Sequence, residues 1–195
     1  MKKLSRSNLW SLEEYAEKRP SFRAEVIQHK KPRRVMLSDN ASLSFEDFTT
    51  LKYQVQEMLR VERIFEAKDI EEEIQAYNPL IPDGSNWKCT LMFEYPDVDE
   101  RRKALAAMPG VEHQVWVKVG DCERIYAIAN EDMERSNENK TAAVHFLRFE
   151  LDPKSARAAK SGAEIAMGID HSQISCAVTL TDATRQSLLK DLGNL

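Results

Sequence analysis

The segment from Tyr53 to Tyr95 constrains the fold more than any other part of the chain. It joins the run YQVQEMLRVERIFE to the run YNPLIPDGSNWKCTLMFEY. Helical spacing of apolar residues, then two prolines and an Asp-Gly pair, then an apolar stretch predict a long helix, a rigid loop and a strand. Carboxylates and arginines lie among the apolar positions of this helix. Because a buried charge needs a partner, we expect a polar network where the helix is covered.

Length and composition indicate one domain with its own core. The chain has 195 residues, of which 42% are hydrophobic and 31% are charged. A chain of this size buries roughly 70% of its unfolded surface, so we expect residues 1–195 to form a single domain. The net charge of -4 disfavours binding to nucleic acid or to an anionic membrane. One local basic cluster, from His29 to Arg34, is typical of a solvated helix end or of a phosphate contact.

Three cysteines, Cys89, Cys122 and Cys176, indicate a reducing compartment. Their odd number and wide spacing match neither a disulfide framework nor a CxxC zinc pattern. The N-terminus does not resemble a signal peptide, and no apolar run approaches the roughly 20 residues of a membrane span. We therefore expect a cytoplasmic protein without a membrane partner. Cys122, in a Gly-Asp turn, is the cysteine that we expect to meet solvent.

The order of the predicted elements favours an α+β fold with a mixed, largely antiparallel sheet and packed helices. Ser11 with Glu14 has the spacing of a capping box and begins the first helix, which Pro20 should kink or split. Further helices are expected at 49–66, 69–77, 97–108 and 152–162, and after Asp182. Strands are expected at 35–37, 43–45, 87–95, 113–119, 124–129, 143–151, 164–170 and 174–181.

Two carboxylates share the face of the 49–66 helix that should be buried. At about 100° per residue, Glu62 falls within the apolar arc and Glu66 follows one turn later. That arc consists of Leu51, Val55, Met58, Leu59 and Phe65. Such carboxylates must form ion pairs, bind a metal or remain partly exposed. We favour an ion pair and expect Glu62 to be mostly buried against an arginine, with Arg148 as the preferred partner.

Two histidines are the other candidates for chemistry. His145 lies on the apolar side of the predicted 143–151 strand, and a histidine there is usually a hydrogen-bonded core residue. His171 follows Asp170 at a turn between two predicted strands, where the carboxylate could orient the imidazole; the plainer interpretation is a turn residue without a chemical role. A metal site, if the chain has one, would draw its ligands from Glu62, Glu66, His145 and His171.

The loop at residues 78–86 is expected to be ordered. Its prolines reduce the entropy lost on ordering, and Leu80 and Ile81 should anchor it. We expect it to shape a pocket against the 49–66 helix, with pocket or partner contacts from Asn78, Asp83, Asn86 and Arg148. The chain contains no GxGxxG, Walker, HExxH, GxSxG or EF-hand pattern, so catalytic residues, cofactors and any reaction stay unassigned.

The runs YQVQEMLRVERIFE, YNPLIPDG and TAAVHFLRFEL, together with the GIDH turn, resemble an uncharacterised bacterial domain family. Genes of that family often lie beside those for rubrerythrin and for an iron-sulfur oxidoreductase of the heterodisulfide-reductase type. The resemblance spans nearly the whole chain and brings no assigned activity. It marks Gln56, Glu57, Arg60, Glu62, Asn78, Pro79, Asp83, Gly84, His145 and Arg148 without giving them roles.

The resemblance implies peroxide or redox metabolism in a bacterial cytoplasm. We therefore expect an accessory or interaction protein of a redox system, with a rubrerythrin-type or iron-sulfur protein as its partner. The alternative is a metal-binding protein or an enzyme with a carboxylate and histidine site.

Overall fold

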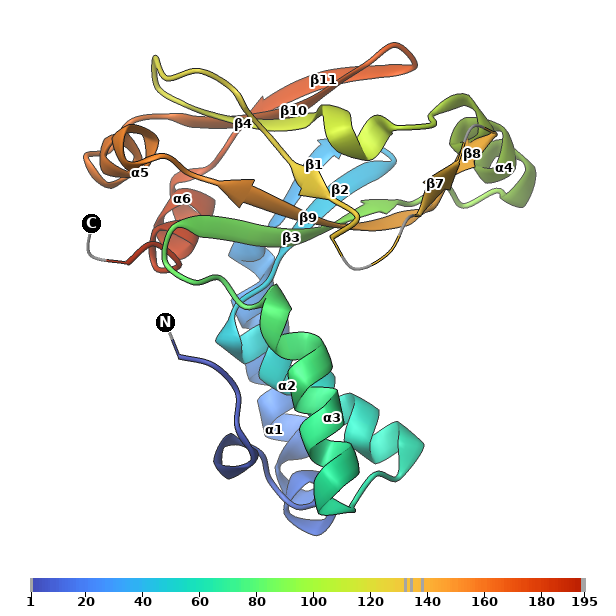
Figure 1. The fold of residues 1–195 in the computed structure, drawn as a ribbon, viewed down its shortest axis with the longest axis vertical. Helices are drawn as coiled ribbons and strands as arrows, with labels where there is room; N and C mark the ends of the chain where they lie inside the picture. The colour runs from blue at the N-terminus through green and yellow to red at the C-terminus, as the bar shows by residue number, and fades with distance from the viewer. Residues whose placement is uncertain (1, 132, 134, 138, 194–195) are drawn as a thin grey trace.

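The computed structural model describes residues 2–131, 133, 135–137 and 139–193. A body of strands carries an arm of helices that projects from it (Figure 1). The helices are α1 Leu12–Lys30, α2 Phe48–Glu62, α3 Ala67–Tyr77, α4 Val98–Ala107, α5 Pro153–Lys160 and α6 Asp182–Leu189. The strands are β1 Arg34–Ser38, β2 Ala41–Phe45, β3 Asn86–Phe93, β4 Val115–Val119, β5 Ile125–Tyr126, β6 Ile128–Ala129, β7 Ser136–Asn137, β8 Lys140–Thr141, β9 Val144–Glu150, β10 Ile165–His171 and β11 Ile174–Thr179. The predicted α+β class is confirmed.

Two antiparallel sheets pack face to face in the body. One has the strand order β1-β2-β3-β9-β6 and the other the order β11-β10-β4-β5, while β7 and β8 form a separate pair. Alternation along each strand directs one set of side chains inward. Leu43 and Leu91 of the first sheet share a single core with Val117 and Ile169 of the second, and all four are fully buried. The outer faces of both sheets are therefore left for polar residues and for contacts.

The arm consists of α1, α2 and α3 and has two hydrophobic clusters of its own. Leu51, Val55, Leu59 and Ile74 centre one cluster, and Tyr15, Phe22 and Val26 form the other. The Ser11 hydroxyl accepts a hydrogen bond from the Glu14 amide at 3.2 Å, as its spacing predicts. The helix that follows is not split at Pro20. Within the described ranges, no helix is both long enough and apolar enough to cross a lipid bilayer.

A partly buried polar network joins α2 to α1, and its centre is Glu57. The Glu57 carboxylate accepts hydrogen bonds from the Arg19 guanidinium at 2.7 and 2.9 Å and from the Tyr15 hydroxyl at 2.7 Å. The Arg19 guanidinium lowers the pKa of Glu57 to about 2. One residue earlier, the Gln56 side chain accepts from the Trp10 amide at 2.7 Å and is itself fully buried. These contacts tie α2 to α1 and to the segment that precedes it.

We expect Glu57→Gln to lower the free energy of unfolding at neutral pH by about 1 to 2 kcal/mol, because charge-assisted hydrogen bonds are lost. A lowered folded-state pKa stabilises the protein above the ordinary carboxyl pKa of 4.5, and this contribution is lost as the pH falls toward 2. The difference in free energy of unfolding between wild type and Glu57→Gln, measured by urea unfolding, should therefore disappear as the pH falls from 4.5 to about 2. Glu62→Gln, on the exposed end of the same helix, is the matched control. A gap that is equal at neutral and acidic pH would contradict this account.

The predicted burial of Glu62 and its pairing with Arg148 are wrong. Helix α2 ends at Glu62, and Arg63 adopts a left-handed conformation with φ 55°. The chain therefore turns away before the expected helical face is complete, which leaves Glu62, Phe65 and Glu66 exposed. Arg148 instead pairs with Glu131 and Glu150.

Candidate functional site

The outer face of the five-stranded sheet meets the arm where β2 leads into α2. Strand register places its side chains in rows across the sheet. One row is Met36, Ser42, Met92 and Val144, and the next is Arg34, Ser44, Thr90 and Phe146. Met36 and Val144 are 45% and 42% exposed, although both are large and apolar. The two lie at opposite ends of the row, and single exposed apolar side chains are common on protein surfaces, so they do not by themselves define a contact surface.

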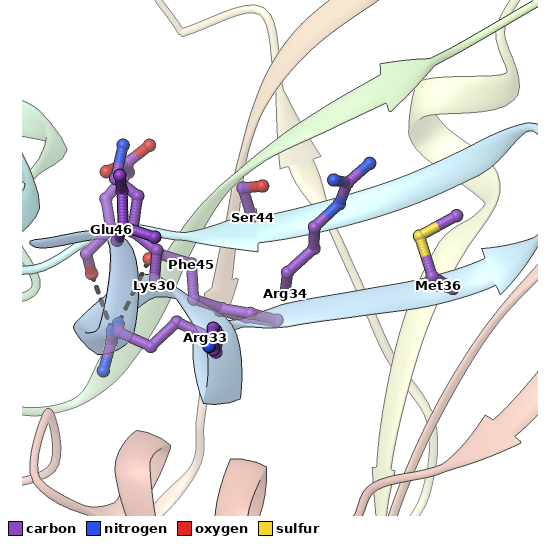
Figure 2. A pocket seen from close by; sticks show the side chains of 9 residues that line it. Lys30, Arg33, Arg34, Met36, Ser44, Phe45 and Glu46 are labelled. Atoms are coloured by element: carbon purple, nitrogen blue, oxygen red, sulfur yellow. Dashed lines mark hydrogen bonds between the residues drawn. The ribbon is translucent and has the colours of Figure 1, made fainter. Parts of the chain in front are cut away.

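A cavity of about 590 Å³ lies between this face and the end of α1, and we call it the basic cavity. Its lining consists of Ile27, Lys30, Lys31, Arg33, Arg34, Met36, Ser44, Phe45 and Glu46. Figure 2 shows Arg34 and Met36 extending from β1 beside Ser44 of β2. The cavity thus combines cationic groups with an apolar floor.

The cations gather here because of how α1 ends. Basic residues are favoured in the last turn of a helix, where they face its negative dipole end, and Pro32 follows in the 3-10 turn Lys31–Arg33. Lys30 and Lys31 are both exposed on this turn, and the Lys30 ammonium lies 5.9 Å from the Tyr53 ring centroid. Arg34 is 46% exposed in its side chain and pairs with Glu94 at 2.5 Å. All three cations remain within reach of a ligand in the cavity.

Arg33 lines the same cavity, but its guanidinium is already hydrogen-bonded to other groups of the protein. Its side chain is 2% exposed and donates to the carbonyls of Phe45 at 3.1 Å and Glu46 at 3.0 Å (Figure 2). It also donates to the Asp191 carboxylate, just after α6, at 2.6 Å and to the Ser187 hydroxyl, within α6, at 3.3 Å. Burial raises the pKa of Asp191 to about 6 in spite of this guanidinium. Arg33 therefore holds the cavity together and leaves binding to its exposed neighbours.

A second cavity, of about 320 Å³, lies on the other side of Glu46, and we call it the loop cavity. Its lining consists of Glu46, Pro79, Leu80, Lys88, Cys89, Glu131, Phe146, Leu147 and Arg148. The 78–86 loop thus shapes a pocket as expected. The pocket lies against β3 and β9, however, so its predicted position against the 49–66 helix is wrong.

The loop is held from three directions. The Asn78 side chain accepts from the Leu4 amide at 2.8 Å, and the Gly193 amide donates to the Gly84 carbonyl at 2.8 Å. Ile81 is 1% exposed. Asp83 and Asn86 also serve the loop, because the Asn86 side chain accepts from the Asp83 amide at 3.3 Å. Of the four residues predicted for pocket contacts, Arg148 alone lines the cavity, and Asn78, Asp83 and Asn86 position its wall.

Arg148 belongs to a chain of ion pairs along the loop cavity. Its guanidinium donates to Glu131 at 2.8 and 2.9 Å and to Glu150 at 2.5 Å. The Asn86 side chain donates to the same Glu150 at 3.0 Å. The Arg148 guanidinium lowers the pKa of Glu131. This cation is already neutralised, unlike the exposed lysines of the basic cavity.

The cysteines do not supply a reactive thiol at either cavity. Cys89 lies in the wall of the loop cavity, and burial raises the pKa of its thiol well above the ordinary value. At neutral pH it is therefore protonated and a poor nucleophile. Cys122 is buried, whereas Cys176 is partly exposed. The expectation that Cys122 meets solvent is thus wrong.

The predicted metal ligands lie in different parts of the molecule. Glu62 and Glu66 are on the arm, His145 is on β9 of one sheet, and His171 is on β10 of the other. In the part of the chain that the structure describes, no three His, Cys, Asp or Glu side chains gather to hold a metal ion. The geometry therefore gives no support to a site built from these four residues.

Both candidate histidines make hydrogen bonds within the protein, although the buried Nδ1 of His145 has no partner among the described residues. His145 is fully buried, and its Nε2 bonds to the Thr141 hydroxyl at 2.8 Å and the Ala142 carbonyl at 3.0 Å, which confirms the expected core histidine. Burial lowers the pKa of His145, so its ring is neutral at pH 7. The His171 Nδ1 accepts from the Gln173 amide at 3.2 Å. Asp170 pairs with Arg124 and does not orient that ring as predicted, because successive side chains of β10 point to opposite faces.

Comparison with known proteins defines the class of this chain without assigning an activity. Residues 3–192 match the model of the family described as "Protein of unknown function (DUF3501)". The chain belongs to that family.

A crystal structure of a protein of unknown function from Burkholderia pseudomallei K96243 is similar over 98% of this chain and 100% of that one, with 44% sequence identity and a TM-score of 0.93. Among curated proteins, none matches the chain. The resemblance inferred from the sequence motifs is therefore confirmed at the level of an uncharacterised family.

Proposed function

We propose that this protein is an accessory interaction protein of a bacterial redox system, and that it holds an acidic segment of its partner in the basic cavity. The observation that carries the proposal is the local reversal of charge. The whole chain has a net charge of -4, yet Lys30, Lys31 and Arg34 surround a cavity of about 590 Å³. Complementary charge steers association and selects partners.

The cavity suits a peptide segment that carries both charge and apolar groups. Ile27, Met36 and Phe45 supply an apolar floor, and Ile27 is 43% exposed before any partner binds. A partner's leucine or aromatic side chain would bury against this floor while its carboxylates face the lysines. Interfaces are commonly built in this way, with an apolar centre and a polar rim.

The class of partner follows from the resemblance set out above. Rubrerythrin-type and iron-sulfur proteins carry their own redox centres, so an accessory protein beside them needs no redox group. We infer that the partner carries out the redox reaction and that this chain holds the partner in position.

The direct test measures binding of the purified rubrerythrin-type protein and of the iron-sulfur oxidoreductase encoded in the same genome. Lys30→Glu combined with Lys31→Glu should weaken binding of the true partner by about tenfold or more, because two attractive charges become repulsive. The loss should shrink as salt is added. Isothermal titration calorimetry at low and high ionic strength reports both effects.

Lys103→Glu combined with Lys154→Glu is the matched control. These two lysines are exposed on α4 and α5, outside the cavity lining, and the pair changes net charge by the same amount. Equal loss of affinity in both double variants would show a general charge effect and would contradict the site. Failure of both candidate partners to bind the wild-type protein would contradict the proposed partner class.

A further inference from the structure

Glu46 and Lys88 are oppositely charged neighbours in the wall of the loop cavity, and they do not pair with each other. The Glu46 amide donates to the Lys88 carbonyl at 2.8 Å, just beyond the last residue pair of β2 and β3. Opposite charges placed across a sheet in this way normally attract each other. Among the residues that the structure describes, however, neither side chain forms an ion pair. Both charges therefore remain available to a third group in the cavity.

The Glu46 carboxylate is oriented by neutral hydroxyl groups. It accepts hydrogen bonds from Thr50 at 2.5 Å and from Thr90 at 3.4 Å. A carboxylate offers about four acceptor positions, so these two contacts leave room for a donor from a ligand. The hydroxyls fix the direction of the carboxylate but do not neutralise its charge.

The Lys88 ammonium is held by the 78–86 loop. It donates to the carbonyls of Pro79 at 2.6 Å and Ile81 at 3.2 Å. An ammonium has three donors, so one remains for a ligand. The loop thus draws the Lys88 side chain away from Glu46 and leaves its positive charge without a counter-ion.

The other charges in and around the loop cavity compensate each other. Arg148 pairs with Glu131 in the lining and with Glu150 outside it. Beyond the lysine ammonium lie Lys3 and Asp83, which have opposite signs and interact with it and with each other. The lining therefore offers a ligand one uncompensated carboxylate and one uncompensated ammonium.

The rest of the lining is mainly apolar and small. Leu80 and Phe146 are half-buried in the cavity wall, and the Arg135 guanidinium lies over the Phe146 ring at 4.7 Å. The volume of about 320 Å³ is at the lower end of the range for pockets that bind small molecules. One apolar side chain of moderate size, with a charged group of each sign beside it, matches this space.

We propose that the loop cavity binds a small zwitterion with an apolar side chain, namely an α-amino acid such as leucine or phenylalanine. The ligand ammonium bonds to the Glu46 carboxylate, the ligand carboxylate bonds to the Lys88 ammonium, and the side chain packs against Leu80 and Phe146. A simple amine or a simple acid would leave one charge of the lining uncompensated. Binding is measured on the purified chain alone, so the proposal does not depend on a partner at the basic cavity.

Isothermal titration calorimetry of the wild-type chain with leucine and phenylalanine tests the proposal. At least one of the two should bind saturably. For leucine, 3-methylbutylamine lacks the carboxylate and 4-methylpentanoate lacks the ammonium. Each of these analogues should bind about tenfold or more weakly than leucine, because one charge-assisted contact is lost. Absence of saturable binding by both amino acids at millimolar concentrations would overturn the proposal, and so would an analogue that binds as tightly as leucine.

Two variants assign the charges of the ligand to the two residues. Glu46→Gln and Lys88→Met should each weaken amino-acid binding by about tenfold or more. Glu46→Gln should weaken the amine analogue and leave the acid analogue unchanged, and Lys88→Met should do the reverse. A variant that only disturbed the fold would weaken both analogues alike, and that result would contradict the proposed contacts.

Glu72→Gln and Lys68→Met are the matched controls. These two residues form an exposed ion pair on α3, outside the lining of the loop cavity, and the substitutions remove the same charges. Both controls should bind the amino acid as tightly as the wild type. A loss of affinity in the controls equal to that in the cavity variants would show a general charge effect and would refute the site.

Discussion

Replacing Arg33 with alanine should lower the free energy of unfolding by about 3 to 5 kcal/mol, because it leaves a buried carboxylate without its cation. Arg33 joins the end of α1 to the β2–α2 junction and to α6. Its guanidinium bonds to Asp191, whose side chain is 4% exposed, and lies 3.5 Å from Asp47. Urea unfolding followed by circular dichroism measures the loss.

Arg34→Ala is the matched control for this change. Arg34 is the next residue, has a side chain 46% exposed and forms one ion pair, with Glu94. Its removal should cost less than about 1 kcal/mol. The double variant Arg33→Met with Asp191→Leu should lose less stability than Arg33→Ala, since no charge is left buried. Similar losses from Arg33→Ala and Arg34→Ala would refute the role assigned to Arg33.

The pH dependence of Asp191 provides a second readout of the same network. Burial raises the folded-state pKa of Asp191 from 3.8 to about 6. A raised pKa means that the protonated carboxyl is the form favoured by folding. Its contribution to stability is present below about pH 4 and is lost as the pH rises through about 6. Removing the Arg33 guanidinium raises the pKa of Asp191 further, so the deficit of Arg33→Ala should shrink as the pH is lowered from neutral to about 6, where wild-type Asp191 also takes up its proton.

Local patterns in the sequence predicted most of the regular structure. The strand expected at 143–151 is β9, Val144–Glu150, and the strand expected at 164–170 is β10, Ile165–His171. The Ser11 cap begins α1 as its spacing indicates. Such features depend on residues within one or two turns of each other, so a single sequence contains the information that they need.

The sequence indicated that α2 carries a polar network, but it did not indicate which residues form that network. Helical spacing correctly identified Leu51, Val55 and Leu59 as buried. The carboxylate that carries the ion pair is Glu57, because Arg19 approaches from another helix, and no local pattern reports that approach. The end of α2 was also missed. A left-handed arginine has no sequence signal comparable to a C-terminal glycine.

The basic cavity shows the same limit. The cluster from His29 to Arg34 was visible in the sequence, with a helix end or a phosphate contact as its expected explanations. Its apolar floor was not visible, because Met36 and Phe45 reach the cavity through the pairing of β1 with β2 and the placement of both beside α1. A binding site made of a helix end and a sheet face exists only after tertiary packing.

Gly168→Ala should be among the most destabilising single-methyl additions in the body, with an expected loss above about 3 kcal/mol. Gly168 lies on β10 between Trp116 of β4 and Ala177 of β11. A methyl group there would lie 2.2 Å from the Cys176 carbonyl oxygen and 2.5 Å from the Trp116 ring. Trp116 is 3% exposed, and the Arg124 guanidinium covers its ring at 4.2 Å. The ring therefore has little room to move.

Two comparisons make the Gly168 prediction specific. Gly193→Ala adds the same methyl group where the nearest atoms lie 3.7 Å away, and it should change stability by less than about 1 kcal/mol. Adding Trp116→Val to Gly168→Ala should not restore wild-type stability, because the shortest contact is with a backbone oxygen that truncation of the ring does not move. Thermal unfolding of the three variants would decide the matter. Recovery in the double variant would mean that ring packing, and not the spacing between β10 and β11, requires glycine at this position.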